Sequence, residues 1–238
     1  MPARSTPHGA PDHTRPLPLL RPPGDWRRVP VEPVGEPLVE VRDINPRIID
    51  DPKYQQMGLA GSRAVAVIRE GVAERLNRVV GCLPDEMTLV VWDAWRSFET
   101  QQALYEGWMA DLARKHTEWS QEVLHRETAR YVSVPSRDPT CPAPHITGGA
   151  IDLTLADADG RPLDLGTEFD AFVPQAGATA LEQTPSAARD NRRLLFWSMA
   201  AEGFTAYVEE WWHFDFGDQF WGSITGQPAR YGPIEPPT

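Results

Sequence analysis

The sequence predicts a single α+β domain in which a central, mainly antiparallel sheet is flanked by helices. Segments with helical periodicity come early in the chain, and segments that alternate like β-strands gather later. The regular strand–helix–strand order of a parallel α/β fold is not seen, which favours an antiparallel sheet. Of the 238 residues, 41% are hydrophobic, which is enough to bury one sizeable core.

The N-terminal 37 residues are rich in proline, arginine and glycine and show little periodicity. We therefore expect residues 1–37 to form a tail that is either disordered or extended along the surface. The next stretch, "LVEVRDI", alternates like a short strand. We place the folded domain at residues 38–238.

Three helices are expected, each with a serine at its N-cap. Ser62 begins the first, in which apolar residues recur every three or four positions up to Gly81. Ser97 begins the second, and Ser186 begins the third, which runs to Gly203. Further strands are expected in "TLVVWDAW", "AIDLTLAD" and "FTAYVEEWWHFDF".

Composition excludes several classes of protein. The formal charge is −11 and no run of basic residues stands out, so nucleic acid is not an expected partner. No stretch approaches the roughly 18 apolar residues of a membrane span, so no membrane partner is expected. Prolines interrupt the N-terminus, so we expect no secretory signal there. Cys82 and Cys141 stand too far apart in the sequence to form a metal knuckle. We expect two unpaired thiols in a reducing cytoplasm; the oligomeric state stays open.

In "PHITGGAIDLTL" a histidine stands seven residues before an acid. Strand alternation puts Asp152 on the face opposite the apolar residues, so we expect it to point away from the core. Seven extended residues span about 23 Å, so His145 meets Asp152 only if the chain folds back. Gly148 and Gly149 permit this because glycine tolerates positive φ and close backbone approach. The segment also fits a Gly-Gly hairpin with an exposed acid and an incidental histidine.

The stretch "VEEWWHFDF" adds a second histidine, His213, and an acid three residues before it, Glu210. One Asp and two His are a common ligand set for a catalytic metal with an open position. A Glu outside the ligand set is what a zinc hydrolase needs as a general base. Each histidine alone fits a structural role, but together with Asp152 and Glu210 they indicate a metal site.

The spacing of Glu210 and His213 has a structural consequence. Residues three apart point to opposite faces of a regular strand, yet the proposed chemistry needs both at the metal. We therefore expect a β-bulge or a strongly twisted strand end at Trp211 and Trp212, since bulges are common beside active sites.

In "VVWDAWRSFETQ" an apolar strand ends at Arg96, directly before the Ser97 cap. Catalytic groups are often displayed at such strand-to-helix corners. Arg96 is therefore a candidate for stabilising the oxyanion formed when water attacks a carbonyl. A surface ion pair is the alternative interpretation.

The strings "WDAWRS", "APHITGGAIDLTL" and "EWWH" together resemble the D-alanyl-D-alanine dipeptidase family. These are the zinc peptidases of vancomycin resistance and of bacterial D-Ala-D-Ala salvage, with cell-wall roles. The family reads "SxHxxGxAxDLTL" and later "EWWH", preceded by an Arg after a "WDGYR"-like strand. The resemblance runs from about residue 54 to residue 216, and the combination of strings is specific.

The resemblance implies a zinc D,D-peptidase fold for residues 38–238, with Zn²⁺ bound by His145, Asp152 and His213. It implies that Glu210 is the general base and that Arg96 stabilises the carbonyl or the transition state.

It also implies that Asp170, in "GTEFDAF", contacts the free amine of the substrate and that Tyr54 borders the substrate. Departures occur near the implied substrate site. The family's "KYATxxNFTG" is "KYQQMGLAG" here, Ala143 replaces a serine, and "SRDPTCP" is additional. The Pro-rich residues 1–37 have no counterpart in the family.

Four hypotheses follow. The first is a cytoplasmic zinc dipeptidase that cleaves a small D,D-dipeptide such as D-Ala-D-Ala. The second is a related metallo-amidase or biosynthetic enzyme acting on another small amide, suggested by the altered "KYQQMGLAG". The third is a two-His-one-carboxylate iron oxygenase, although the usual close His-x-carboxylate spacing is absent and Glu210 would be idle. The fourth is a non-catalytic binding protein, which the occupied catalytic positions disfavour.

Overall fold

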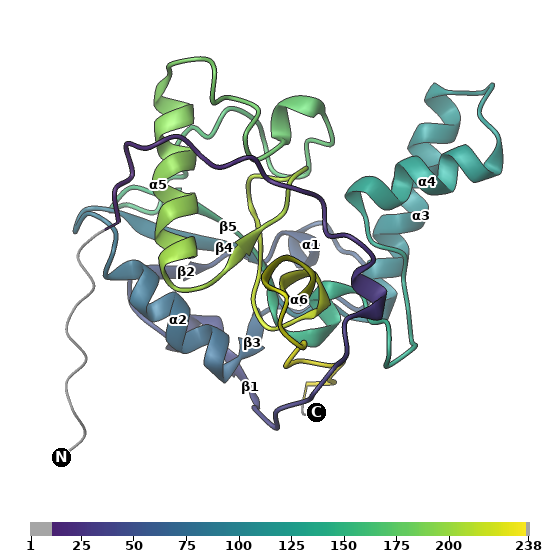
Figure 1. Cartoon of the computed structure of the whole chain (residues 1–238), viewed down its shortest axis with the longest axis horizontal. Helices are drawn as coiled ribbons and strands as arrows, with labels where there is room; N and C mark the ends of the chain where they lie inside the picture. The colour runs from purple at the N-terminus through teal and green to yellow at the C-terminus, as the bar shows by residue number, and fades with distance from the viewer. Residues whose placement is uncertain (1–10, 237–238) are drawn as a thin grey trace.

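A five-stranded sheet in the order β2-β4-β5-β7-β6 forms the centre of the molecule (Figure 1). The computed structural model describes residues 11–236. The strands are β2 (Ile48–Asp50), β4 (Thr88–Asp93), β5 (Ala150–Ala156), β7 (His213–Asp215) and β6 (Thr205–Ala206). β2 pairs with β4 in parallel, and the other neighbours pair antiparallel. The predicted α+β class with a mainly antiparallel sheet is confirmed.

Helices flank this sheet and one pair projects from it. Helix α5 (Ala187–Ala201) packs against β5 and against α2 (Glu70–Val80). Helices α3 (Phe98–Lys115) and α4 (Gln121–Tyr131) form an arm that extends away from the sheet (Figure 1). The short helices are α1 (Lys53–Gln56) and α6 (Gln219–Thr225), and the 3-10 turns are η1 (Trp26–Arg28), η2 (Val41–Asp43), η3 (Pro144–Thr147) and η4 (Pro174–Ala176). None of the helices in residues 11–236 is both long and apolar enough to cross a membrane.

Two of the three predicted helix caps are confirmed. The side chains of Ser97 and Ser186 accept the first-turn N–H groups of α3 and α5. The cap at Ser62 is wrong, because α2 begins only at Glu70. The residues just before it form β3 (Val67–Arg69), which pairs with β1 (Leu38–Glu40). These residues have helical spacing, but they include β-branched side chains that favour strands. Pairing with β1 therefore decides their conformation.

The predicted strand "FTAYVEEWWHFDF" is instead a hairpin of β6 and β7. The expected interruption at Trp211 and Trp212 is present, but it is a loop over residues 207–212 rather than a bulge. Both indole rings are buried, and the Trp212 carbonyl accepts the N–H of Leu153 at 3.1 Å. Core packing of the two tryptophans turns the chain away from regular strand geometry ahead of His213.

Strand β5 is buried on both faces. Ile151, Leu153 and Leu155 are fully buried in the apolar core. Asp152 lies on the opposite face, as expected, yet it is only 2% exposed. That face is covered rather than solvated, so Asp152 must have polar partners inside the protein.

The N-terminal segment, as far as it is described, is extended along the surface (Figure 1). The Arg15 guanidinium lies 3.3 Å from the ring centre of Trp197 on α5, and the Thr14 carbonyl accepts a hydrogen bond from Arg193. Leu17 and Trp26 are buried. Residues 11–37 therefore follow the surface with two buried side chains and a 3-10 turn, and residues 1–10 of that expectation lie outside the described residues.

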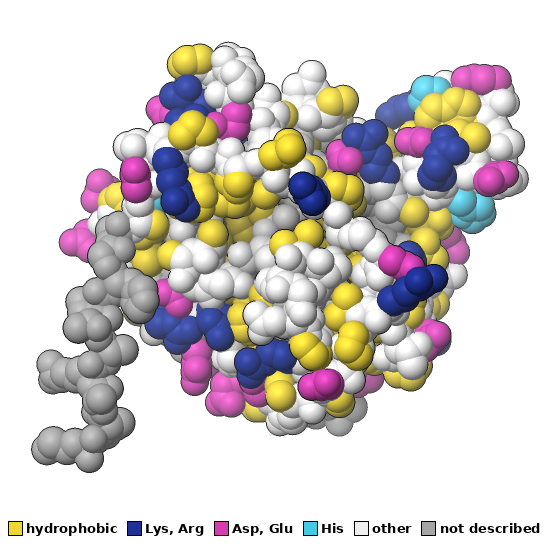
Figure 2. All heavy atoms as spheres, in the orientation of Figure 1, with side chains coloured by type: hydrophobic (Ala, Val, Ile, Leu, Met, Phe, Trp, Pro, Cys, Tyr) yellow, Lys and Arg dark blue, Asp and Glu magenta, His cyan; other side chains and the backbone are white. Residues whose placement is uncertain are grey.

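On the face that this segment crosses, basic and acidic side chains are interspersed (Figure 2). The two cysteines, Cys82 and Cys141, are not joined in a disulfide, as predicted.

Candidate active site

Three neighbouring strands place polar residues side by side. Asp152 on β5 lies opposite Asp93 on β4 and opposite His213 on β7. The β4–β5 register shifts between Val91 and Asp93, and this irregularity brings Asp93 into line with Asp152. The row occupies the buried polar face of the sheet.

His145 reaches this row from a turn. It lies in η3, which ends at Gly148 in the left-handed conformation with φ 72°. A Cβ on Gly149 would stand 2.6 Å from the carbonyl oxygen of Phe216, so only glycine fits there. The expected fold-back between His145 and Asp152 is confirmed. A 3-10 turn produces it rather than the alternative Gly-Gly hairpin.

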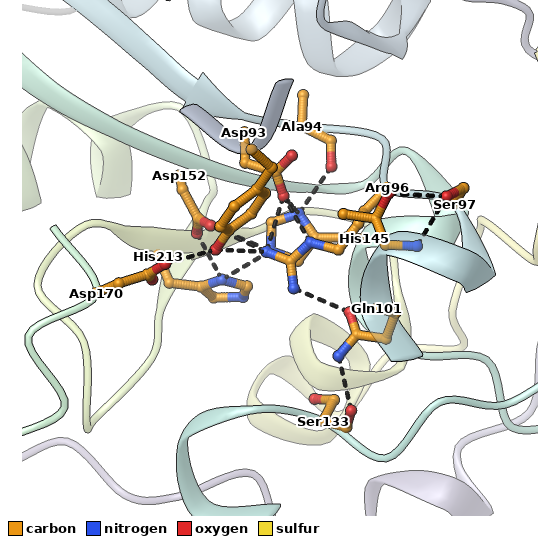
Figure 3. Close-up of polar contacts among 12 residues, drawn as sticks. Asp93, Ala94, Arg96, Ser97, Gln101, Ser133, His145, Asp152, Asp170 and His213 are labelled. Carbon is orange, nitrogen blue, oxygen red and sulfur yellow. Dashed lines mark hydrogen bonds and ion pairs between the residues drawn. The ribbon is translucent and has the colours of Figure 1, made fainter. Parts of the chain in front are cut away.

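The side chains of His145, Asp152 and His213 converge (Figure 3). Nδ1 of His213 lies 2.9 Å from one Asp152 carboxylate oxygen, and Nε2 of His145 lies 3.5 Å from the other. The two inner nitrogens are 3.3 Å apart, and all three candidate ligand atoms lie within 4.8 Å of one another. All three side chains are buried.

The outer ring nitrogens identify the tautomers. Nδ1 of His145 lies 2.7 Å from the Ala94 carbonyl, which is only an acceptor, so this nitrogen carries a proton. Nε2 of His213 lies 2.9 Å from Asp215 and donates to it in the same way. In the neutral rings both inner nitrogens are then acceptors, which face each other and the Asp152 carboxylate. Such a donor set fits a cation.

Arg96 is buried beside this cluster. Its Nε donates to Asp93 at 2.8 Å, and its Nη1 donates to Gln101 at 2.9 Å (Figure 3). Its Nη2 lies 3.3 Å from Asp152 and 3.5 Å from the Tyr54 hydroxyl. Burial alone would lower the pKa of the guanidinium, but the neighbouring Asp93, Tyr54, Asp152 and Asp170 together outweigh burial and raise it, so Arg96 stays charged. The surface ion pair considered as an alternative is wrong, because the side chain is buried.

Tyr54 and Asp170 form a second polar pair. The Tyr54 hydroxyl donates to Asp170 at 2.9 Å. Asp170 has φ 56°, a left-handed conformation that is uncommon outside glycine and often marks a functional position. Burial, together with the charge of Asp152, raises the pKa of Asp170 to about 7.

One cavity collects every residue predicted from the sequence for the site: Tyr54, Arg96, His145, Asp152, Asp170, Glu210 and His213. Its apolar lining includes Leu104, Tyr131, Phe172, Tyr207 and Phe220. Glu210 comes from the loop before β7, and burial raises its pKa well above the ordinary value. A buried carboxyl in the same cavity as a candidate metal site is a candidate for proton transfer.

Sequence reasoning missed three polar residues that hold the site: Asp93, Gln101 and Asp215. Asp215 had a usable signal, because residues two apart on a strand share a face and "HFD" puts it beside His213. Asp93 and Gln101 had none, since their roles depend on a register shift and on the position of α3.

Comparison with known proteins gives a consistent result. The sequence model of the D-ala-D-ala dipeptidase family matches residues 61–229. A D-alanyl-D-alanine dipeptidase of Synechocystis is 29% identical over 235 aligned residues, covering 87% of this chain and 95% of its own. A D-alanyl-D-alanine dipeptidase of Escherichia coli is 42% identical over 78 residues, or 33% of this chain and 40% of its own.

Among solved structures, VanYB in complex with D-alanine-D-alanine has a TM-score of 0.43 and 15% identity, covering 69% of this chain and 81% of its own. The resemblance found in the three sequence motifs is confirmed by the family match, which spans well over half of the chain. The protein therefore belongs to the D-ala-D-ala dipeptidase family of metallopeptidases.

Proposed function

We propose that this protein is a zinc-dependent dipeptidase that hydrolyses a small D,D-dipeptide such as D-Ala-D-Ala. The observation that carries the proposal is the convergence of three lone-pair donors, from His145, Asp152 and His213, in the cavity that also holds Glu210 and Asp170. The names of its relatives support the substrate class.

The donor set fits zinc. Two imidazole nitrogens and one carboxylate are a usual catalytic zinc set, and they leave one position open for water or substrate. A zinc ion held there would lower the pKa of a water molecule and polarise the peptide carbonyl. The Ala94 carbonyl and the Asp215 carboxylate orient the two rings, as outer partners of metal-bound histidines commonly do.

Glu210 is the proposed general base. It lines the cavity beside the ligands but is not one of the three converging groups. It takes a proton from the attacking water and delivers it to the amine that leaves.

Arg96 is the proposed oxyanion stabiliser. Its bonds to Asp93 and Gln101 fix the guanidinium at the cavity wall before substrate arrives. A fixed positive charge in a buried site stabilises developing negative charge better than a mobile one, because little reorganisation is needed.

Asp170 is the proposed partner of the substrate ammonium group, with Tyr54 holding its carboxylate in place. A carboxylate and an ammonium form a charge-assisted hydrogen bond, so this contact favours dipeptides with a free amino end.

The test joins metal analysis to an assay. The purified protein is stripped with a chelator and reloaded with Zn²⁺ or Fe²⁺, and release of D-Ala from D-Ala-D-Ala is measured beside L-Ala-L-Ala. Zinc-dependent release from the D,D substrate supports the proposal. Zinc binding without turnover of either dipeptide would point to another amide substrate. Oxygen consumption by the iron-loaded protein would favour an iron oxygenase over a hydrolase.

A further inference from the structure

The first turn of α6 joins the N-terminal segment to the active-site cavity. Trp26, in η1, meets Phe220 edge-on with ring centres 4.9 Å apart. Both rings are almost buried, at 9% and 8% exposure. Phe220 is one of the residues that line the cavity. Trp26 therefore packs against a residue that lines the cavity.

The neighbouring residue Gln219 makes a second connection. Its side-chain amide donates to the Val29 carbonyl at 2.8 Å and to the Thr140 carbonyl at 3.0 Å. Val29 belongs to the N-terminal segment, and Thr140 belongs to the additional "SRDPTCP" stretch that leads to His145. One buried amide thus links the N-terminal segment and the stretch before His145 to α6.

Close packing and backbone bonds fix the rest of this contact. A Cβ on Gly222 would stand 2.6 Å from Val29 Cγ1, so α6 accepts Val29 only with a glycine there. Val31 pairs with Ala229 as an isolated β-bridge, and the Ala229 N–H donates to the Pro30 carbonyl at 2.9 Å. Residues 25–32, here called the η1 segment, are therefore held by contacts of Trp26, Val29, Pro30 and Val31.

The contact continues toward the metal ligands. Phe220 lies 5.7 Å from Tyr207, and Tyr207 lies 5.8 Å from the ring of His213, measured between ring centres. The Tyr207 hydroxyl donates to the Arg130 carbonyl of α4 at 2.7 Å, which fixes the ring at its far end. Phe220 and Tyr207 form one aromatic wall of the cavity.

We infer that the η1 segment belongs to the substrate-binding unit, and that Trp26 is a positioning residue that holds the Phe220–Tyr207 wall against the cavity. Without the indole, Phe220 would have free space behind it and the wall would loosen. The apolar part of a bound dipeptide would then lose a fixed surface. This last consequence rests on the proposed function, whereas the positioning of the wall does not.

The experiment compares Trp26→Ala with Leu17→Ala in the full-length protein. Leu17 is buried to the same extent and anchors the same N-terminal segment, but it lies outside the η1 segment and does not line the cavity. Trp26→Phe keeps a ring and is the rescue variant. Amide hydrogen exchange of residues 205–222 and steady-state kinetics on D-Ala-D-Ala are measured for each.

Trp26→Ala should speed exchange in residues 207–212 and in the first turn of α6, whereas Leu17→Ala should not. KM should rise about threefold to tenfold with kcat nearly unchanged, because a wall that binds ground and transition states alike acts on KM. Trp26→Phe should recover most of the loss.

Equal exchange in the alanine variants and the wild type would overturn the inference, as would equal KM changes for Trp26→Ala and Leu17→Ala. If Trp26→Ala does not fold, Trp26→Leu replaces it in the same comparison. If Trp26→Ala exchanges faster than the wild type as predicted, but the wild type does not cleave D-Ala-D-Ala, the proposed substrate is refuted and the positioning role stands.

Discussion

Oδ1 of Asp215 lies 2.9 Å from Nε2 of His213, and the two residues stand two positions apart on the same strand, β7. Both side chains therefore leave the strand on one face, and both are buried. The carboxylate holds the outer nitrogen as a donor and turns the inner nitrogen, Nδ1, toward Asp152. The strand itself thus supplies both a candidate ligand and the group that orients it.

Loss of this partner should weaken metal binding. Asp215→Ala should reduce zinc affinity by about 10- to 100-fold, the usual effect of removing an outer partner of a metal-bound histidine. Asp215→Asn keeps an acceptor oxygen and should lose less. Competition with a chromophoric chelator measures the affinity directly. An unchanged zinc Kd in Asp215→Ala would show that His213 is oriented by packing alone.

Glu210→Gln should separate catalysis from metal binding. The three proposed ligands remain, so the purified variant should keep its zinc, while kcat should fall by roughly 10²- to 10⁴-fold. Glu209→Gln is the matched control, because Glu209 is adjacent but forms an ion pair with Arg130 at 2.8 Å. Loss of metal in Glu210→Gln, or near-normal turnover, would remove Glu210 from the role of base.

His213→Ala should give the opposite pattern. A lost ligand should release the metal, and activity should disappear with it. Metal content after dialysis is the measurement, made side by side with Glu210→Gln. A His213→Ala protein that retains one equivalent of zinc would contradict the ligand set.

The candidate site residues could be recognised from short motifs and from the family resemblance, although the residues that support them could not. Two glycines lie among the six residues between His145 and Asp152, and an acid stands three residues before His213, so short-range patterns pointed to all four residues. Asp93 joins the site only through a register shift between β4 and β5, a property of strand pairing that one sequence does not display.

The fold class was also predictable from local sequence patterns. The two wrong predictions concern segments whose conformation depends on strand pairing. An apolar run located β4, alternation located β5, and serine caps located α3 and α5. The segment before α2 had helical spacing but pairs with β1, and the last predicted strand folds into a hairpin around two buried tryptophans. Tertiary contacts decide the conformation of both segments, and local propensity does not reveal such contacts.

Asp170→Ala should discriminate between substrates. If Asp170 binds the substrate ammonium group, kcat/KM should fall far more for D-Ala-D-Ala than for its N-acetyl derivative, which has no charge there. The comparison of both substrates in wild type and variant gives the ratio. Equal losses on the two substrates would show that Asp170 does not contact the amino end.

The same contact predicts a pH dependence. Burial and the charge of Asp152 raise the pKa of Asp170 to about 7, so the carboxylate is the main form only above that pH. As pH falls through 7, protonation removes the negative charge that the ammonium needs. The ratio of kcat/KM for the free dipeptide to that for the N-acetyl derivative should therefore decline toward acid. Asp170→Asn, which has no charge to lose, should give a low ratio that is flat over this range. A wild-type ratio that stays constant between about pH 5.5 and 8 would separate Asp170 from amine recognition.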